Sequence, residues 1–153
     1  MKIPIATYRL QFHAEFDFQA AHAIASYLAA LGISDLYASP IFKARVGSPH
    51  GYDVVDPTQL NPEVGTPEEF DALINTLQQH QIGWLQDIVP NHMAYDSNNQ
   101  YLMDILENGS NSEAIEFFDI EWNHAYESFK GRVLAPLLGD LYGNCLENGD
   151  IQL

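Results

Sequence analysis

Two short segments of the 153-residue chain contain side chains that are suited to binding a sugar. Residues 48–53 read SPHGYD and residues 87–92 read DIVPNH. Their candidate side chains are Tyr52, His50 and Asp53 in the first segment and Asp87, Asn91 and His92 in the second. An aromatic ring packs against the CH face of a sugar, and short polar groups bond its hydroxyls. The set has no glycine-rich phosphate loop and no nucleophile beside a base, so we interpret it as a candidate glycan site.

Each of these side chains also has a purely structural interpretation. Tyr52 could lie in the core, Asp87 could cap a turn, and His92 could be a hydrogen-bonded loop histidine. A metal site is a further alternative, because imidazole and carboxylate groups are both metal ligands. Neither segment has a paired-ligand spacing such as His-x-x-x-His, so we expect no metal and no other cofactor.

The pattern of the first 92 residues predicts strands and helices in alternation. Strands are expected over residues 5–12, 35–38 and 84–89, the last as a central strand covered on both faces. Asp17 is the expected cap of one helix that Gly32 ends, and Thr66, Pro67 and Glu69 form a capping box for the next. Residues 41–62 are rich in Gly, Pro and polar residues and are expected to form one long loop.

This alternation determines where the two segments lie. Three strands joined by helical crossovers are expected to be parallel, in an α/β sheet that is either doubly wound or part of a (β/α)8 barrel. Ligands bind beyond the carboxyl ends of such strands. Both segments follow predicted strands, so we expect them to converge on one side of the sheet.

The remaining residues break this rhythm. Short helices are expected over residues 100–107 and 112–118, and Asn148-Gly149 is typical of a hairpin turn. We therefore expect two parts, residues 1–92 with the sheet and residues 93–153 as an inserted subdomain.

Composition limits the partners. The net charge is −15, and residues 51–153 carry eighteen acidic and only two basic side chains. That field repels nucleic acid and anionic membranes but leaves a neutral glycan unaffected. There is no secretory signal or apolar run of spanning length, so the expected location is the cytoplasm.

Several segments together resemble the alpha-amylase family of (β/α)8 barrels. DIVPNH at residues 87–92 is similar to the family's signature after the third barrel strand, and HGYD at residues 50–53 to its loop after the second. Three stretches, TYRLQ at 7–11, LYASP at 36–40 and SPHGYDVVD at 48–56, resemble those members that turn a terminal α-1,4 link of maltooligosaccharides into an α,α-1,1 link. A looser similarity extends through VLAPLLG at 133–139 to the insertion after strand three.

The resemblance implies roles for the candidate residues. Tyr52 would stack on the glucosyl ring at the cleavage subsite, His92 would bond a ring hydroxyl, and Asp87 would support the region of the nucleophile. Asn91 would hold its loop, and in calcium-dependent relatives its counterpart binds the ion. His50 and Asp53 would contact the substrate or shape the loop. The implied reaction is a retaining one, with a carboxylate nucleophile and a second carboxylic acid as proton donor.

The resemblance also implies what these residues lack. The family's nucleophile and acid/base lie on later strands, and nothing in residues 93–153 matches their motifs. We expect an amino-terminal part of a larger barrel that is inactive alone and needs the rest of that barrel as its partner. Two alternatives stay open: the parent protein could be a hydrolase of the same family, or the chain could be a non-catalytic glycan-binding module.

Overall fold

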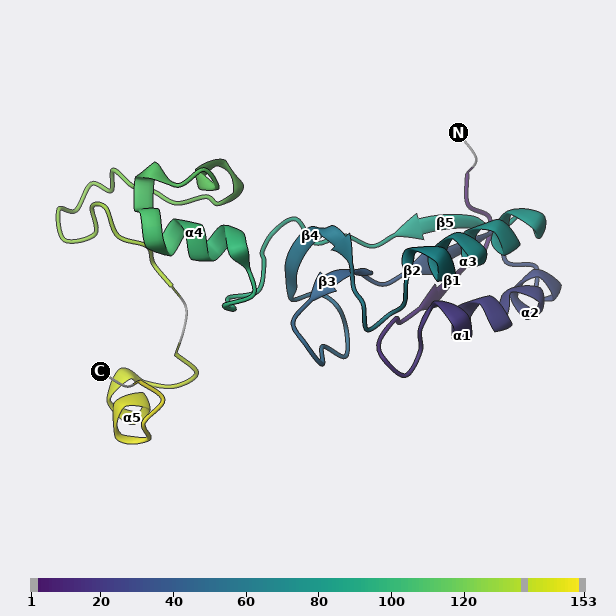
Figure 1. Ribbon diagram of the computed structural model, residues 1–153, viewed down its shortest axis with the longest axis horizontal. Coiled ribbons are helices and arrows are strands. Elements are labelled where there is room, and N and C mark those ends of the chain that lie inside the picture. Colours follow the sequence, from purple (N-terminus) through teal and green to yellow (C-terminus); the bar gives the residue numbers. More distant parts are fainter. Residues whose placement is uncertain (1–2, 136–137, 152–153) are drawn as a thin grey trace. The chain divides into compact units, whose positions relative to one another are not determined.

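A computed structural model describes residues 3–135 and 138–151 of the chain and divides it into two compact units. Unit 1 is Met1–Gln100 and unit 2 is Tyr101–Leu153 (Figure 1). Residues 136–137, inside the stretch that resembles the family's insertion, lie outside the described residues. We describe each unit separately.

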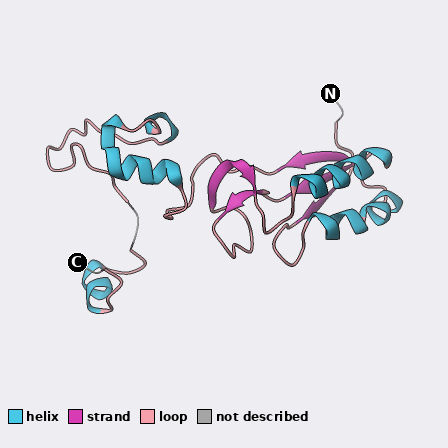
Figure 2. Cartoon of the chain, in the orientation of Figure 1, coloured by secondary structure: helices cyan, strands magenta, loops and turns pink. Residues whose placement is uncertain are grey.

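Unit 1 is built on a three-stranded parallel sheet. Strands β1 (Thr7–Leu10), β2 (Asp35–Ala38) and β5 (Gly83–Gln86) pair in the order β1-β2-β5 (Figure 2). The register places Arg9 beside Tyr37, and Tyr37 beside Leu85. The predicted α/β class and the parallel pairing are therefore confirmed. The strands lie side by side with their carboxyl ends at one edge, as the alternating pattern requires.

Helices pack on one face of this sheet. They are α1 (Phe18–Ala23), α2 (Ala25–Ala30) and α3 (Pro67–Gln79). Asp17 caps α1 as predicted, because its side chain accepts a hydrogen bond from the Ala20 amide at 2.8 Å. The prediction of one continuous helix up to Leu31 is wrong. Ile24 forms a tight turn, donating to the Ala21 carbonyl at 3.3 Å, and this turn separates α1 from α2.

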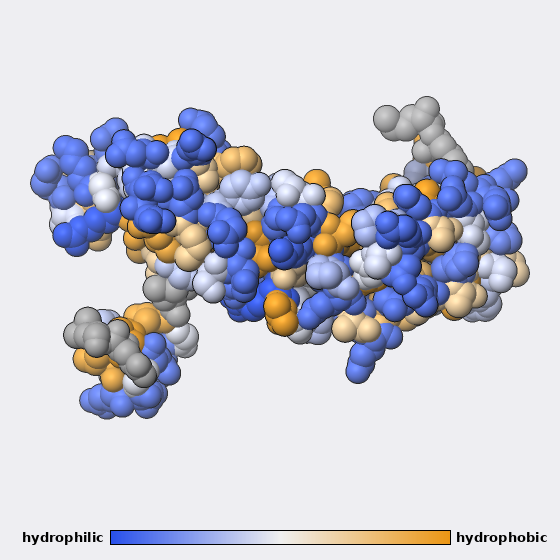
Figure 3. Space-filling model, in the orientation of Figure 1, coloured by the Kyte–Doolittle hydropathy of each residue, from blue (hydrophilic) through white to orange (hydrophobic). Residues whose placement is uncertain are grey.

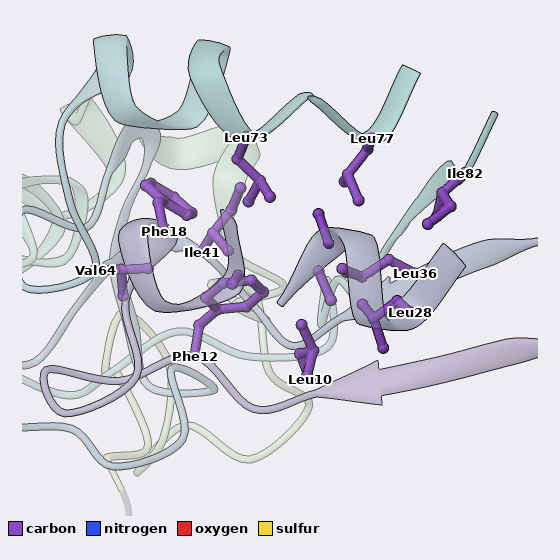
Figure 4. Close-up of a cluster of buried hydrophobic side chains, with 13 residues drawn as sticks. Leu10, Phe12, Phe18, Leu28, Leu36, Ile41, Val64, Leu73, Leu77 and Ile82 are labelled. Carbon is purple, nitrogen blue, oxygen red and sulfur yellow. The ribbon is translucent and has the colours of Figure 1, made fainter. Parts of the chain in front are cut away.

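The helices and the sheet enclose one apolar core (Figure 4). Alternation along a strand sends every second side chain of the sheet toward the helices. Phe12 packs there against Phe18 and Trp84. The centroid of its ring lies 5.6 Å from that of Phe18 and 5.9 Å from that of Trp84. The buried members are Leu10, Phe12, Phe18, Ala21, Ala25, Leu28, Leu36, Ala38, Ile41, Val64, Leu73, Leu77 and Ile82.

The start of α3 has the predicted capping box. The Thr66 hydroxyl accepts from the Glu69 amide at 3.3 Å, and the Glu69 carboxylate accepts from the Thr66 amide at 2.8 Å. These two bonds satisfy backbone N–H groups that a helix start otherwise leaves unpaired.

Replacing the capping residue should loosen this helix. We expect Thr66→Ala to destabilise the first turn of α3 by about 1 kcal/mol, because the Glu69 amide loses its acceptor. Exchange of the backbone amides of residues 68–72 should accelerate in the variant. Thr66→Ser, which keeps the hydroxyl, is the matched control, and equal exchange in both variants would contradict the assignment.

The long loop predicted over residues 41–62 is wrong. This segment contains two antiparallel strands, β3 (Phe42–Ala44) and β4 (Val54–Leu60), in a separate small sheet. The pairing is irregular, with register shifts on both sides of Lys43, and β4 contains Pro57. Because the pairing is irregular, these strands do not show the regular alternation of apolar and polar residues that predicts a strand. Its consequence for the site is that residues 45–53 form the connection between two paired strands.

The last strand of the sheet also differs from expectation. The strand predicted over residues 84–89 ends at Gln86. In the sheet that the described residues form, β5 lies at an edge and β2 lies in the centre. Leu85 and Ile88 are exposed rather than covered. The side-chain amide of Gln86 donates hydrogen bonds to the backbone carbonyls of Ser39 at 3.2 Å and Asp87 at 2.8 Å. These bonds hold the turn that follows the strand.

Unit 2 has little regular structure. Its longest helix, α4 (Gln100–Asn108), matches the prediction and buries Leu102 and Ile105. The helix predicted over residues 112–118 is only a short 3-10 turn, Ile115–Phe117, preceded by another at Gly109–Asn111. The predicted hairpin is wrong: Asn148 caps the end of α5 (Tyr142–Glu147), because the same residue types that suit tight turns also end helices.

A network of hydrogen bonds links α4 to the turns that follow it in unit 2. Asp104 on α4 accepts hydrogen bonds from the hydroxyl of Ser112 and, at 2.7 Å, from the side chain of Asn108. These bonds lower the pKa of Asp104. Hydrophilic side chains cover much of the visible face of each unit (Figure 3). None of the helices in the described part of the chain is both long and apolar enough to span a membrane.

Candidate active site

The two candidate segments meet at the carboxyl end of the sheet. Asp87 directly follows β5, and its backbone amide donates to the Ala38 carbonyl at the end of β2 at 2.9 Å. Its carboxylate accepts a hydrogen bond from the Tyr52 hydroxyl at 2.5 Å. Thirty-five positions separate these residues in sequence. The expected convergence of the two segments is therefore present in the fold.

Residues 48–53 are held by their own hydrogen bonds. The Gly51 amide donates to the Ser48 hydroxyl at 3.1 Å, and the Tyr52 amide donates to His50 Nδ1 at 3.0 Å. The Ser48 hydroxyl in turn donates to the Asp53 carboxylate. The His50 and Tyr52 rings lie 5.8 Å apart. Asp53 therefore bonds within its own loop, whereas the Tyr52 hydroxyl reaches across to Asp87.

A glycine is required inside this loop. Gly51 has φ +73, in the left-handed region, and a Cβ built on it would lie 2.6 Å from the Pro40 carbonyl oxygen. The close approach brings residues 48–53 against the end of β2, and backbone atoms cannot yield as a flexible side chain can.

We expect Gly51→Ala to displace the loop and separate Tyr52 from Asp87. The left-handed conformation and the contact with Pro40 should together cost about 1–3 kcal/mol, so the thermal unfolding midpoint should fall. Differential scanning fluorimetry would measure this shift. Gly47→Ala is the control because Gly47 shares a positive φ of 74 but has open space around its Cβ position. An equal shift in both variants would contradict a specific role for the Pro40 contact.

Asn91 and His92 lie apart from the contact between Tyr52 and Asp87. Both are exposed, and the Asn91 side-chain nitrogen lies 3.3 Å from His92 Nδ1. Among the residues that the structure describes, no hydrogen bond links either of them to Tyr52 or Asp87. The structure thus joins Asp87 to residues 48–53 and leaves Asn91 and His92 as a separate pair after β5.

Three further residues join the site that sequence reasoning did not assign to it. Arg9 Nη2 donates to the Tyr52 hydroxyl at 3.0 Å, and its Nη1 donates to Gln11 Oε1 at 2.9 Å. The Arg9 guanidinium also lies over the Tyr37 ring, 5.7 Å from its centroid. A signal was available, because Arg9 and Gln11 alternate with apolar residues in the strand predicted over residues 5–12 and are therefore expected on one face.

The electrostatics of this group centre on Asp87. A hydrogen bond to Asp87 raises the pKa of the Tyr37 hydroxyl, since the carboxylate favours the protonated phenol. The hydrogen bond to Tyr52 raises the pKa of Arg9. Two phenols, Tyr37 and Tyr52, therefore donate to one carboxylate, and the Arg9 guanidinium donates to the second of them.

The described residues hold no group of three His, Cys, Asp or Glu side chains that could bind a metal ion. Two pockets lie within unit 2, of about 580 and 650 Å³. None of the six candidate residues lines either of them. The candidate site is instead an open group of side chains beyond the strand ends, where ligands of α/β sheets bind.

This chain belongs to the alpha-amylase family. The family model described as "Alpha amylase, catalytic domain" matches residues 21–134, which include both candidate segments. The parallel strands and the polar groups beyond their carboxyl ends agree with that assignment.

Within the family, several proteins similar over most of the chain are named maltooligosyl trehalose synthases. A Mycobacterium tuberculosis relative, provisionally named maltooligosyl trehalose synthase, is 38% identical over 97% of the chain. A solved maltooligosyl trehalose synthase superposes with a TM-score of 0.80 at 38% identity over 96% of the chain. The maltooligosyltrehalose synthase of Arthrobacter ramosus gives 0.73 at 41% identity over 78%. The chain covers 21%, 20% and 16% of these proteins, and thus spans about a fifth of their length.

Proposed function

We propose that this chain supplies the glucosyl-binding edge of the active site of a maltooligosyltrehalose synthase. The observation that carries the proposal is the direct bond between Tyr52 and Asp87, which unites the two segments similar to the family's motifs. The 38% identity to a provisionally named maltooligosyl trehalose synthase over 97% of the chain supports this choice within the family.

The proposed reaction is an intramolecular transglucosylation. The α-1,4 bond at the reducing end of a maltooligosaccharide breaks, and the released glucose attacks again through its anomeric hydroxyl to form an α,α-1,1 bond. Mass is unchanged and the reducing end is lost. Water must be kept out for this outcome, since water attacking in place of glucose would give hydrolysis.

Each candidate residue receives a role in this proposal. Tyr52 stacks on the glucosyl ring, with its hydroxyl fixed by Asp87 at 2.5 Å. Asp87 positions that ring and supports the region of the nucleophile with its charge. His92 bonds a sugar hydroxyl, while Asn91 holds its loop.

His50 and Asp53 shape the loop that carries Tyr52. His50 Nδ1 lies 3.8 Å from an Asp53 carboxylate oxygen and accepts from the Tyr52 amide. We assign neither a metal nor a cofactor to these residues.

The proposal includes a partner. Residues 1–92 would form the first strands of a (β/α)8 barrel, and residues 93–153 the start of an insertion after its third strand. The nucleophile and the acid/base would come from later strands, so residues 1–153 alone would not catalyse the reaction. The remainder of the barrel and a maltooligosaccharide are the proposed partners, and nucleic acid and membranes are not, given the charge of −15.

Product analysis tests the function. The protein encoded by the whole reading frame should convert maltopentaose into a product of unchanged mass that no longer reduces copper reagents. Rising reducing ends and free glucose would instead identify a hydrolase and reject the synthase assignment. Residues 1–153 expressed alone should give neither product, and saturable maltopentaose binding by them with cooperative unfolding would favour a glycan-binding module.

A further inference from the structure

We propose that Arg9 in β1 and Gln11, the residue after this strand, form a clamp that positions the Tyr52 loop, residues 48–53, over Asp87. This inference rests on the proposed function for its kinetic consequence, but the clamp itself is a statement about structure. The clamp makes Arg9 a positioning residue, because Arg9 acts through the Tyr52 hydroxyl.

The clamp holds the loop at two points. Arg9 donates to the Tyr52 hydroxyl at 3.0 Å, and Gln11 Nε2 donates to the His50 carbonyl at 3.0 Å. The two clamp residues are themselves joined by the 2.9 Å bond between Arg9 and Gln11. Arg9 therefore fixes the end of the aromatic side chain, and Gln11 fixes the backbone of the loop.

The donor directions explain why an arginine suits this place. Tyr52 has one hydroxyl proton, and Asp87 can only accept. Since Arg9 can only donate, its bond leaves the Tyr52 proton free to point at Asp87. The planar guanidinium donates hydrogen bonds to Gln11 and Tyr52 at the same time. A lysine, with its single ammonium group, would hold these two partners less rigidly.

The surroundings of Arg9 also differ from those of an ordinary exposed charged side chain. Its guanidinium lies 5.7 Å from the centroid of the Tyr37 ring, the neighbour of Arg9 in the strand register. Arg9 thus interacts with both Tyr37 and Tyr52. Because Arg9 is exposed, it adds little to the apolar core, and its removal should leave the sheet intact.

A small displacement of the ring should have a large kinetic effect. A misplacement of about 1 Å in a positioning group can lower a rate about 100-fold. We expect Arg9→Met to lower kcat for maltopentaose conversion about 10- to 100-fold and to change KM less than about threefold. Arg9→Lys should fall between wild type and Arg9→Met, because it keeps one charged donor.

The experiment combines kinetics with hydrogen exchange on the protein encoded by the whole reading frame. Arg9→Met, Tyr52→Phe and the double variant form a cycle. If Arg9 acts through the Tyr52 hydroxyl, the double variant should be no slower than the slower single variant. Exchange of the amides in residues 48–53 should accelerate in Arg9→Met. Lys130→Gln, which removes an exposed basic residue paired with Glu127, is the control for loss of charge.

Each result decides the matter. Independent, multiplicative losses in the cycle would overturn the action of Arg9 through Tyr52. Unchanged exchange in residues 48–53 would overturn the clamp itself. If the wild-type protein makes no α,α-1,1 product, the proposed function fails while the exchange result still decides the clamp. Faster exchange together with non-additive kinetics is the expected result.

Discussion

Tyr52→Ala should lower kcat/KM for maltopentaose about 30- to 700-fold in the protein encoded by the whole reading frame. The substitution removes both the proposed stacking surface for the glucosyl ring and the hydroxyl that binds Asp87 at 2.5 Å. A lost aromatic contact and a lost hydrogen bond to a charged group together amount to about 2–4 kcal/mol, and each 1.4 kcal/mol is about tenfold in rate. Initial rates at several maltopentaose concentrations would measure the loss.

Tyr52→Phe separates the two contributions. It keeps the ring but leaves the Asp87 carboxylate without this donor, so we expect a loss of about tenfold. If Tyr52→Ala and Tyr52→Phe are equally impaired, the hydroxyl alone matters and the stacking role fails. If Tyr52→Ala is as active as wild type, Tyr52 does not belong to the site. Tyr126→Ala, an exposed tyrosine of unit 2, is the matched control.

The helix ends and the strand order show which parts of the fold a sequence can predict. Asp17 and Thr66 are N-caps because their side chains bond backbone amides three positions ahead, and so the whole signal lies within a few residues. The parallel pairing follows from the alternation of elements, since right-handed crossovers leave few other arrangements. Convergence of the two candidate segments followed from that topology alone.

The parts that sequence reasoning missed depend on contacts between distant residues. β3 and β4 join through nine residues with no two-residue turn signal, and their register shifts remove the alternation that predicts strands. Asn148-Gly149 suited both a hairpin and a helix end, and here Asn148 caps α5 while Gly149 has φ +77. Arg9 joins the site because it lies in register with Tyr37 and within reach of Tyr52, 43 positions away.

Asp87 organises these contacts, so its charge should matter more than its shape. The carboxylate accepts from Tyr52 and Tyr37, and Arg9 lies behind Tyr52. Asp87→Asn keeps the size of the side chain but removes the charge and one acceptor oxygen. We expect kcat for maltopentaose conversion to fall about 100- to 1,000-fold, because preorganised charge in a site is worth about 3–4 kcal/mol.

A second readout of Asp87→Asn requires no activity. The bond to Asp87 raises the pKa of Tyr37, so wild-type Tyr37 should keep its proton above the ordinary tyrosine range. In Asp87→Asn the Tyr37 pKa should fall toward its ordinary value, because an amide favours the protonated phenol less than a carboxylate does. An NMR titration of labelled tyrosine, assigned with Tyr37→Phe, would measure this. An unchanged Tyr37 pKa would contradict the network, whereas a lowered pKa with full activity would confirm the network and remove Asp87 from the catalytic proposal.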